Sequence, residues 1–108
     1  MDSLGLEEIG YDRFLQQSMG KGVLALLVYT PTCGTCQLAK KIMGVVAKGL
    51  PQVGCVQLNL NHHEQLAIDF KVQSVPCLLI FKEGEFLGSF YRFSVLELYQ
   101  HLENILAK

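Results

Sequence analysis

The sequence predicts an α/β domain in which a central mixed β-sheet of four to five strands is flanked by helices on both faces. Short apolar runs typical of buried strands alternate along the chain with segments of helical periodicity. The inferred order is helix, strand, helix, strand, helix, strand, strand, helix, so a β-α-β unit precedes a β-β-α unit. A length of 108 residues without repeats or linkers predicts one domain over residues 1–108.

The first half of the chain predicts two helices and two strands. Apolar residues at helical spacing predict a helix over residues 6–19, although residues 4–9 also fit a short edge strand. The apolar run at 23–29 predicts a strand buried on both faces. A helix over residues 33–49 and an alternating strand at 55–60 follow. The residues expected to face the core from the two helices are Ile9, Phe14, Leu15, Met19, Leu38, Ile42, Val45 and Val46.

The second half predicts a short helix, a β-hairpin and a last helix. Asn61 is expected to be the N-cap of a helix that ends near residue 70. Residues 77–81 form a second buried strand, and a hairpin turn returns the chain as a strand over 86–91. Ser94 and Glu97 have the spacing of a capping box, which predicts the start of the last helix there. The predicted core face of this helix contains Leu98, Tyr99, Leu102, Ile105 and Leu106.

Composition and charge exclude several classes of function. Half of the residues are hydrophobic and the net charge is −1, with no basic block, which argues against disorder and against a nucleic-acid-binding protein. The longest apolar run has far fewer than the roughly twenty residues of a membrane-spanning helix. The amino terminus is acidic where a signal peptide is basic. These features predict a cytoplasmic protein that does not interact with membranes.

The chemistry is carried by Cys33-Gly34-Thr35-Cys36, at the point where a strand gives way to a helix. The free N–H groups and the positive end of a helix favour a thiolate, which predicts Cys33 as an exposed nucleophile. Cys36 lies one helical turn later, within disulfide reach, and is predicted to be the buried resolving thiol. The pair is also half of a zinc site, but no second pair of ligands has the required spacing. Redox chemistry is therefore the favoured interpretation.

The chain resembles the thioredoxin family over nearly its whole length. The resemblance rests on the strand before Cys33 and Cys36, the later Val75-Pro76 step, the apolar strand at 78–81 and the turn at 82–85. It implies the thioredoxin fold and a cis Val75–Pro76 bond packed beside the two sulfurs. A proline at the first residue of a buried strand fits that position.

The resemblance also implies a substrate-binding surface. The backbone of Val75 is expected to pair with the bound substrate chain. Thr32, Gly34 and Thr35, which surround the two cysteines in the motif, are assigned to the same surface. Arg92 stands where a glycine is common near the substrate groove, which predicts a bulkier and more basic groove.

The sequence departs from the usual thioredoxin pattern at four further positions. Thr32 replaces a tryptophan, and Thr35 replaces a proline. The change at Thr35 is expected to loosen the first helical turn and to make the redox couple less reducing. Leu27 replaces a buried aspartate that assists proton transfer, and Gln57 replaces the lysine that accompanies it. Deprotonation of the resolving thiol must then rely on water or on another group.

Three further residues have two interpretations or no assigned role. Cys77 opens a buried strand, so it is either a core residue or a third redox sulfur. Cys55 is interpreted as a strand residue without a role. Lys40 lies one turn beyond Cys36, either on a solvated helix face or close enough to favour the thiolate of Cys36.

These observations predict a monomeric thiol–disulfide oxidoreductase without a bound cofactor or metal. Its substrates would be proteins or small molecules that contain disulfides, and a reductase or a low-molecular-weight thiol would donate electrons. The alternative is a weakly catalytic binding module, or a protein that holds a metal or an iron–sulfur cluster on the same cysteines. The absent charges at Leu27 and Gln57 favour the binding module, whereas the intact Cys33/Cys36 pair opposes it.

Overall fold

The computed structural model describes residues 6–108, which form a five-stranded mixed sheet with helices on both faces. Its strands are β1 (Glu7–Glu8), β2 (Val23–Tyr29), β3 (Val53–Asn59), β4 (Cys77–Lys82) and β5 (Glu85–Phe90), and its helices are α1 (Tyr11–Ser18), α2 (Gly34–Gly49), α3 (Glu64–Asp69) and α4 (Val95–Ala107). The strand order is β1-β3-β2-β4-β5, in which β4 runs antiparallel to both of its neighbours. The predicted fold class is confirmed.

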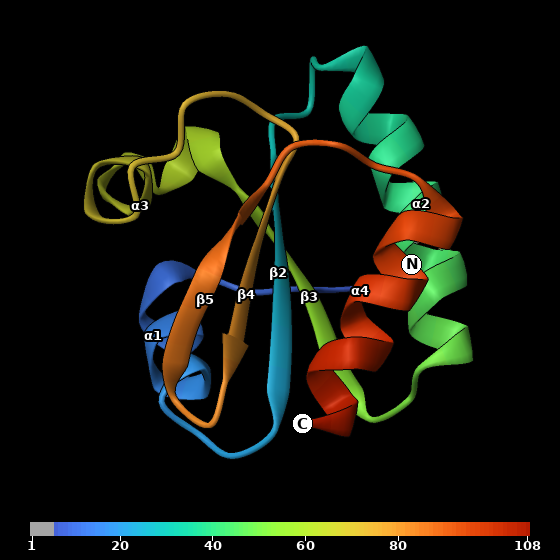
Figure 1. The fold of residues 1–108 in the computed structure, drawn as a ribbon. Helices are drawn as coiled ribbons and strands as arrows, with labels where there is room; N and C mark the ends of the chain where they lie inside the picture. The colour runs from blue at the N-terminus through green and yellow to red at the C-terminus, as the bar shows by residue number, and fades with distance from the viewer. Residues whose placement is uncertain (1–5) are drawn as a thin grey trace.

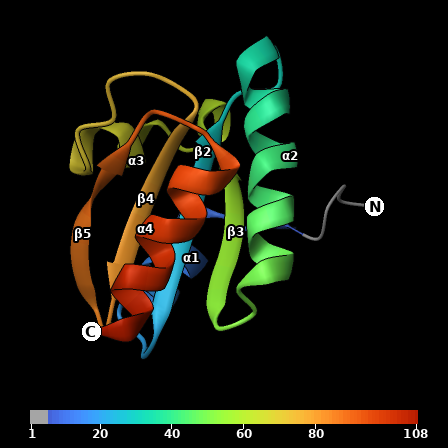
Figure 2. The ribbon, with the colours of Figure 1, turned by 45° about the vertical axis from the view of Figure 1, so that its right-hand side comes forward.

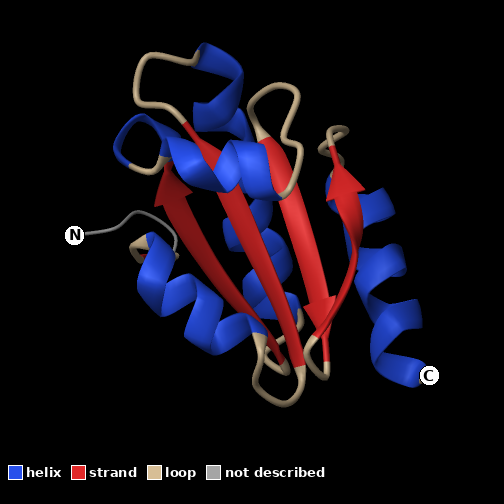
Figure 3. Ribbon diagram, turned by 90° about the vertical axis from the view of Figure 1, so that its left-hand side faces the viewer, coloured by secondary structure: helices blue, strands red, loops and turns tan. Residues whose placement is uncertain are grey.

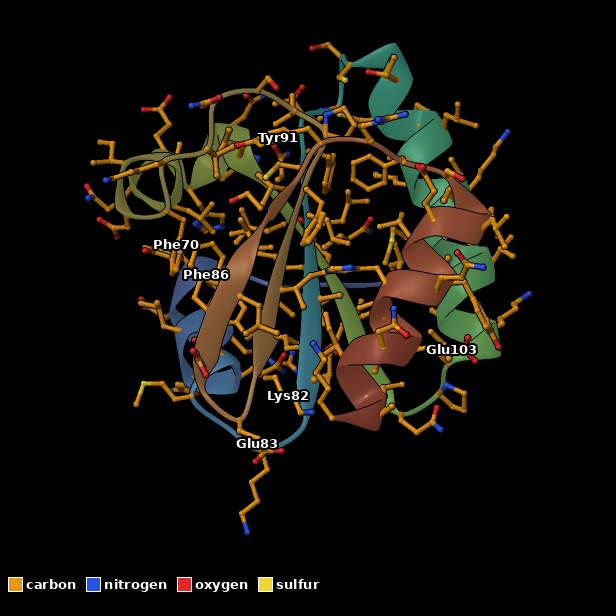
Figure 4. All side chains as sticks on the ribbon, viewed as in Figure 1. Phe70, Lys82, Glu83, Phe86, Tyr91 and Glu103 are labelled. Atoms are coloured by element: carbon orange, nitrogen blue, oxygen red, sulfur yellow. The ribbon has the colours of Figure 1, made fainter. Side chains whose placement is uncertain are left out.

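The sheet separates two hydrophobic cores. Helices α2 and α4 cover one face, and α1 and α3 cover the other (Figures 1 and 2). Strand β2 lies in the middle and is buried along its whole length, as its uninterrupted apolar sequence predicts. On the α3 side, Phe70 and Phe86 lie close together between α3 and β5 (Figure 4), with ring centroids 5.3 Å apart. No helix within residues 6–108 has the length and apolar character needed to span a membrane.

The amino-terminal segment forms an edge strand before its helix. Strand β1 pairs with β3, and only then does α1 begin. Figure 3 shows the sheet with helices in front of it and behind it. Ile9 and Phe14 are buried as predicted, but Leu15 and Met19 are 37% and 77% exposed, so half of the predicted face was wrong. Met19 lies beyond the last turn of α1, where the helical spacing no longer applies. The expected strand residues 4 and 5 lie outside the described part of the chain.

The predicted core face of α2 was also wrong in part. Val46 is buried, but Leu38 and Val45 are 59% and 54% exposed, while Ala39 and Met43 face the sheet instead. The two sets differ by a rotation of about one residue around the helix, roughly 100°. Small Ala39 favours the observed face because it allows a close approach of α2 to the sheet.

The capping predictions had different outcomes. Asn61 is not an N-cap: the side chain of Asn59 accepts a hydrogen bond of 3.0 Å from the Asn61 amide and caps a 3-10 turn, and α3 begins only at Glu64. Because residues 60–62 form this 3-10 turn, α3 starts later than predicted. Ser94 does cap α4, because its hydroxyl accepts a hydrogen bond of 3.4 Å from the amide of Glu97.

Candidate functional site

The two cysteines of the motif lie at one edge of the sheet, where β2 ends and α2 begins. Cys33 is the N-cap of α2, with an extended backbone (φ −87°, ψ 116°), and its sulfur accepts a hydrogen bond of 3.2 Å from the Cys36 amide. The Cys33 amide donates in turn to the carbonyl of Thr30 at 3.3 Å, which closes the loop. Figure 1 shows the segment between α3 and β4 passing over this same edge. All four cysteines are free thiols.

Cys33 is the partly exposed sulfur of the pair, and its surroundings favour the thiolate. The pKa of Cys33 is lowered from 9.0, chiefly by its side-chain interaction with Cys36, then by the hydroxyl of Thr35 and by backbone N–H groups. The Thr35 Oγ1 atom lies 3.2 Å from the Cys33 sulfur. The geometry therefore places the more acidic thiol where a substrate can reach it.

Cys36 is the buried sulfur, with no exposed surface. Burial, followed by its interaction with Cys33, raises the pKa of Cys36 from 9.0 to about 11. An amide hydrogen bond from Thr30 and the charge of Lys40 act in the opposite direction. Two thiols one turn apart thus have opposite tendencies to ionise, the arrangement that a nucleophile and a resolving thiol require.

The Val75–Pro76 peptide bond is cis and opens β4 next to the motif. The carbonyl oxygen of Val75 lies 4.0 Å from the Cys33 sulfur. A residue just after β5 contacts the loop that precedes β4. The Tyr91 hydroxyl accepts a hydrogen bond of 3.1 Å from the amide of Gln73, and Figure 4 shows Tyr91 where β5 ends at this edge of the sheet. Nothing in the sequence pattern singled out Tyr91.

The other predicted surface residues are exposed around the pair. Thr32, Gly34 and Thr35 all present exposed side chains or backbone at the mouth of the site. Arg92 is also exposed and lines a hollow of about 210 Å³ together with residues of α4. That hollow lies between the end of β5 and α4.

The sheet beneath the pair carries no ionisable group at the two altered positions. Leu27 and Gln57 are direct neighbours across β2 and β3, and they are 0% and 4% exposed. The Gln57 amide donates to the carbonyl of Leu6 at 3.5 Å, toward the amino-terminal segment. A proton released by the resolving thiol therefore has no carboxylate to receive it at either position.

The charged group that acts on the resolving thiol is Lys40 of α2, whose positive charge lowers the pKa of Cys36. The Lys40 ammonium lies 3.7 Å from the centroid of the Tyr29 ring, a cation–π contact. The Tyr29 hydroxyl donates to Glu8 at 2.6 Å, which fixes the ring. Lys40 was considered from its helical spacing alone, whereas Tyr29 and Glu8 were missed. An aromatic residue at the end of the strand before the motif was the available signal.

The remaining two cysteines, Cys77 and Cys55, are strand residues. Cys77 is fully buried in the core on the α1 and α3 side, and burial raises its pKa. This placement favours a core residue over a third redox sulfur. Cys55 is half-buried in β3, and burial raises its pKa from 9.0 to about 11. Neither thiol is activated.

The described residues contain no set of side chains that could hold a metal ion. Within residues 6–108, no three His, Cys, Asp or Glu side chains gather closely enough to hold an ion. The described residues therefore offer a metal on Cys33 and Cys36 no further ligand from a cluster of this kind.

Comparison with known proteins identifies the family. A family model for thioredoxin matches residues 4–103, nearly the whole chain. The chain belongs to the thioredoxin family. It is 46% identical over 79 residues to the thioredoxin-like protein YusE of Bacillus subtilis, an alignment that covers 72% of this chain and 74% of that protein. It is 27% identical over 77 residues to a thioredoxin of Chlamydia muridarum, covering 71% and 74% of the two chains.

Solved thioredoxin structures show the same fold. Thioredoxin from Trypanosoma brucei brucei superposes with a TM-score of 0.88 at 17% identity, covering 100% of this chain and 98% of that one. Oxidised mitochondrial thioredoxin 3 from Saccharomyces cerevisiae gives a TM-score of 0.85 at 15% identity, covering 96% and 99%. Family and fold, together with the Cys33–Cys36 pair, support a thiol oxidoreductase in general.

Proposed function

We propose that this protein reduces disulfide bonds of proteins or small molecules by dithiol–disulfide exchange. The observation that carries the proposal is that two thiols one helical turn apart have pKa values shifted in opposite directions. Cys33 is partly exposed with a lowered pKa, and Cys36 is buried with a pKa raised to about 11. A structural pair of cysteines does not need this difference.

In the proposed reaction, the Cys33 thiolate attacks one sulfur of the substrate disulfide. A Cys33–substrate disulfide forms, and the second substrate sulfur leaves as a thiolate with the electron pair of the broken bond. Cys36 then loses its proton and attacks Cys33, which releases the second thiolate and leaves a Cys33–Cys36 disulfide. The substrate gains two electrons, and the protein loses them.

The rim of the site is proposed to hold the substrate chain. The Val75 carbonyl, 4.0 Å from the Cys33 sulfur, lies where it can accept a hydrogen bond from an extended substrate backbone. Pro76 shapes this wall, and Thr32 and Gly34 form the opposite, exposed rim. We further propose that the protein acts in the cytoplasm as a monomer, and that a reductase or a low-molecular-weight thiol returns it to the dithiol form.

Two measurements test the proposal. A redox titration against defined thiol–disulfide buffers, read by alkylation and intact mass, should reveal a two-electron couple that Cys33→Ser and Cys36→Ser each abolish. Insulin-disulfide reduction in the presence of dithiothreitol should require Cys33, whereas Cys55→Ala is the matched control and should retain activity. If no Cys33–Cys36 disulfide forms at any potential, the oxidoreductase proposal fails. A weakly catalytic binding module, which the absent charges at Leu27 and Gln57 favour, or a metal-holding protein would then take its place.

A further inference from the structure

The Thr35 side chain lies at the mouth of the site and contacts the reactive sulfur. Its Oγ1 atom is 3.2 Å from the Cys33 Sγ atom, and the residue is exposed, so no core packing dictates this contact. Proline, the residue of the familiar thioredoxin motif at this position, has no hydrogen-bond donor. The contact is therefore a property of this chain and of its threonine.

The ionisation state of Cys33 decides which atom donates. A thiolate carries no proton, so the threonine hydroxyl must be the donor when Cys33 is ionised. The Cys36 amide donates to the same sulfur, also at 3.2 Å, so the hydroxyl is one of several donors to it. Hydrogen bonds to a charged acceptor are about twice as strong as neutral ones.

Few other groups face this sulfur. Cys36 is the titratable neighbour on α2, and the charge of Lys40 acts on Cys36 from the next turn of the helix. The segment before β4 contributes the Val75 carbonyl, 4.0 Å away, which is an acceptor and does not stabilise a thiolate. Two described side chains donate to this sulfur, the Cys36 thiol and the Thr35 hydroxyl. Of these, the Thr35 hydroxyl is the one that a substitution can remove without altering the redox pair itself.

We propose that Thr35 is a catalytic residue whose hydroxyl donates a hydrogen bond to the Cys33 thiolate of the reduced protein. This role rests on the proposed function, because it assigns a partner to the proposed nucleophile. When the Cys33–substrate disulfide forms, negative charge moves to the leaving sulfur and the hydrogen bond weakens, while Thr35 keeps its proton throughout. The bond therefore stabilises the dithiol form over the disulfide form and makes the couple less reducing.

Two substitutions separate the hydroxyl from the shape of the side chain. Thr35→Val removes the donor and keeps the branched shape, whereas Thr35→Ser keeps the donor and removes a methyl group. The readout is the rate of Cys33 alkylation by iodoacetamide as a function of pH, assigned to Cys33 by peptide mass. Thr35→Val should move the profile to higher pH and slow alkylation several-fold on its acidic side. Thr35→Ser should retain the wild-type profile.

The reduction potential gives a second readout. Thr35→Val should be more reducing than the wild type, and Thr35→Ser should match it. A Thr35→Val profile that superimposes on the wild type would overturn the proposal, as would equal shifts in both variants, which would indicate a packing role. Alkylation needs no substrate, so it reports on Thr35 even if turnover is absent. Failure of the Cys33–Cys36 disulfide to form would instead remove the proposed function.

Discussion

The attack of Cys36 on a disulfide between Cys33 and a substrate should accelerate steeply with pH. Burial and the interaction with Cys33 raise the pKa of Cys36 from 9.0 to about 11. At pH 7, a thiol with a pKa near 11 is ionised in about one molecule in ten thousand, against about one in a hundred for a pKa of 9. Because the thiolate is the nucleophile, the resolving step should be slow at neutral pH.

The mixed disulfide removes one of the causes of the raised pKa. Once Cys33 is bonded to substrate it carries no charge, so its contribution is lost and the burial of Cys36 remains. The pH profile of the resolving step should therefore have its inflection between the two values, 9.0 and about 11. Below the inflection, the rate should rise about tenfold for each pH unit.

A pH-jump experiment measures this step directly. Cys33 is loaded with thionitrobenzoate in acid, where Cys36 is protonated, and the protein is then mixed into buffers of increasing pH. The absorbance of released thionitrobenzoate follows the attack of Cys36. A rate that reaches its plateau near neutral pH would refute the reasoning, because it would mean that a protein group accepts the proton despite Leu27 and Gln57.

Lysine variants test the electrostatic part of the same reasoning. Lys40→Met removes the charge that favours the Cys36 thiolate, and it should slow the resolving step about twofold, the size expected of a partly exposed charge pair one helical turn apart. Lys40→Arg should retain the rate. Lys41→Met, the matched control on the neighbouring exposed position, should have no effect. Equal effects at both lysines would indicate net charge alone.

Three further predictions concern stability. Gly49→Ala places a Cβ atom 2.6 Å from a ring carbon of Tyr99, so it should lower the free energy of unfolding in urea by about 1–2 kcal/mol. In a Tyr99→Leu background the same substitution should be neutral or stabilising. An equal cost in both backgrounds would contradict the clash. The pKa of Cys55 is raised to about 11 by burial, so its contribution to stability is full below pH 9.0 and is lost as pH rises toward 11, by up to about 2 kcal/mol; Cys55→Ala should flatten this part of the pH–stability curve, and an unchanged slope would refute it. Lys82 donates to the carbonyl of Ile105 in the last turn of α4 at 2.6 Å and to that of the C-cap residue Lys108 at 2.5 Å. Lys82→Met should cost about 1 kcal/mol and accelerate amide exchange in the last turn, with unchanged exchange as the contrary result.

The two central strands, β2 and β4, were predictable because each is a continuous apolar run. The run at Val23–Tyr29 is buried at every residue, and Cys77–Phe81 likewise, so no choice between faces arises. A helix poses a harder problem because two adjacent stripes can both be apolar. In α2, Leu38 and Val45 have the right spacing, but so do Ala39 and Met43, and packing against the sheet selected the second pair.

The site was predictable in its covalent parts and less so in its contacts. Spacing alone places Cys33 and Cys36 one turn apart at the start of a helix, and the family resemblance implies the cis bond at Pro76. The contact of Thr35 with the Cys33 sulfur depends on a side-chain rotamer, and a rotamer is not encoded in spacing. Similarly, the position of Lys40 over Tyr29 depends on how β2 and α2 pack together.

The difference in pKa between Cys33 and Cys36 originates in groups of α2 more than in groups of the sheet. Leu27 and Gln57 leave the sheet beneath the pair without an ionisable group, yet the pKa of Cys33 is lowered and that of Cys36 is raised. Apart from burial and the interaction of the two thiols with each other, the groups that lower the pKa of Cys33 are the Thr35 hydroxyl and the backbone amides of the first turn of α2. The Thr30 amide and the Lys40 ammonium lower the pKa of Cys36 and so reduce the difference. The donors of α2 therefore favour the nucleophilic step, in which Cys33 attacks. The resolving step has no buried carboxylate to accept the proton of Cys36 and depends on solvent. The pH-jump experiment tests this reasoning directly because it measures the resolving step alone.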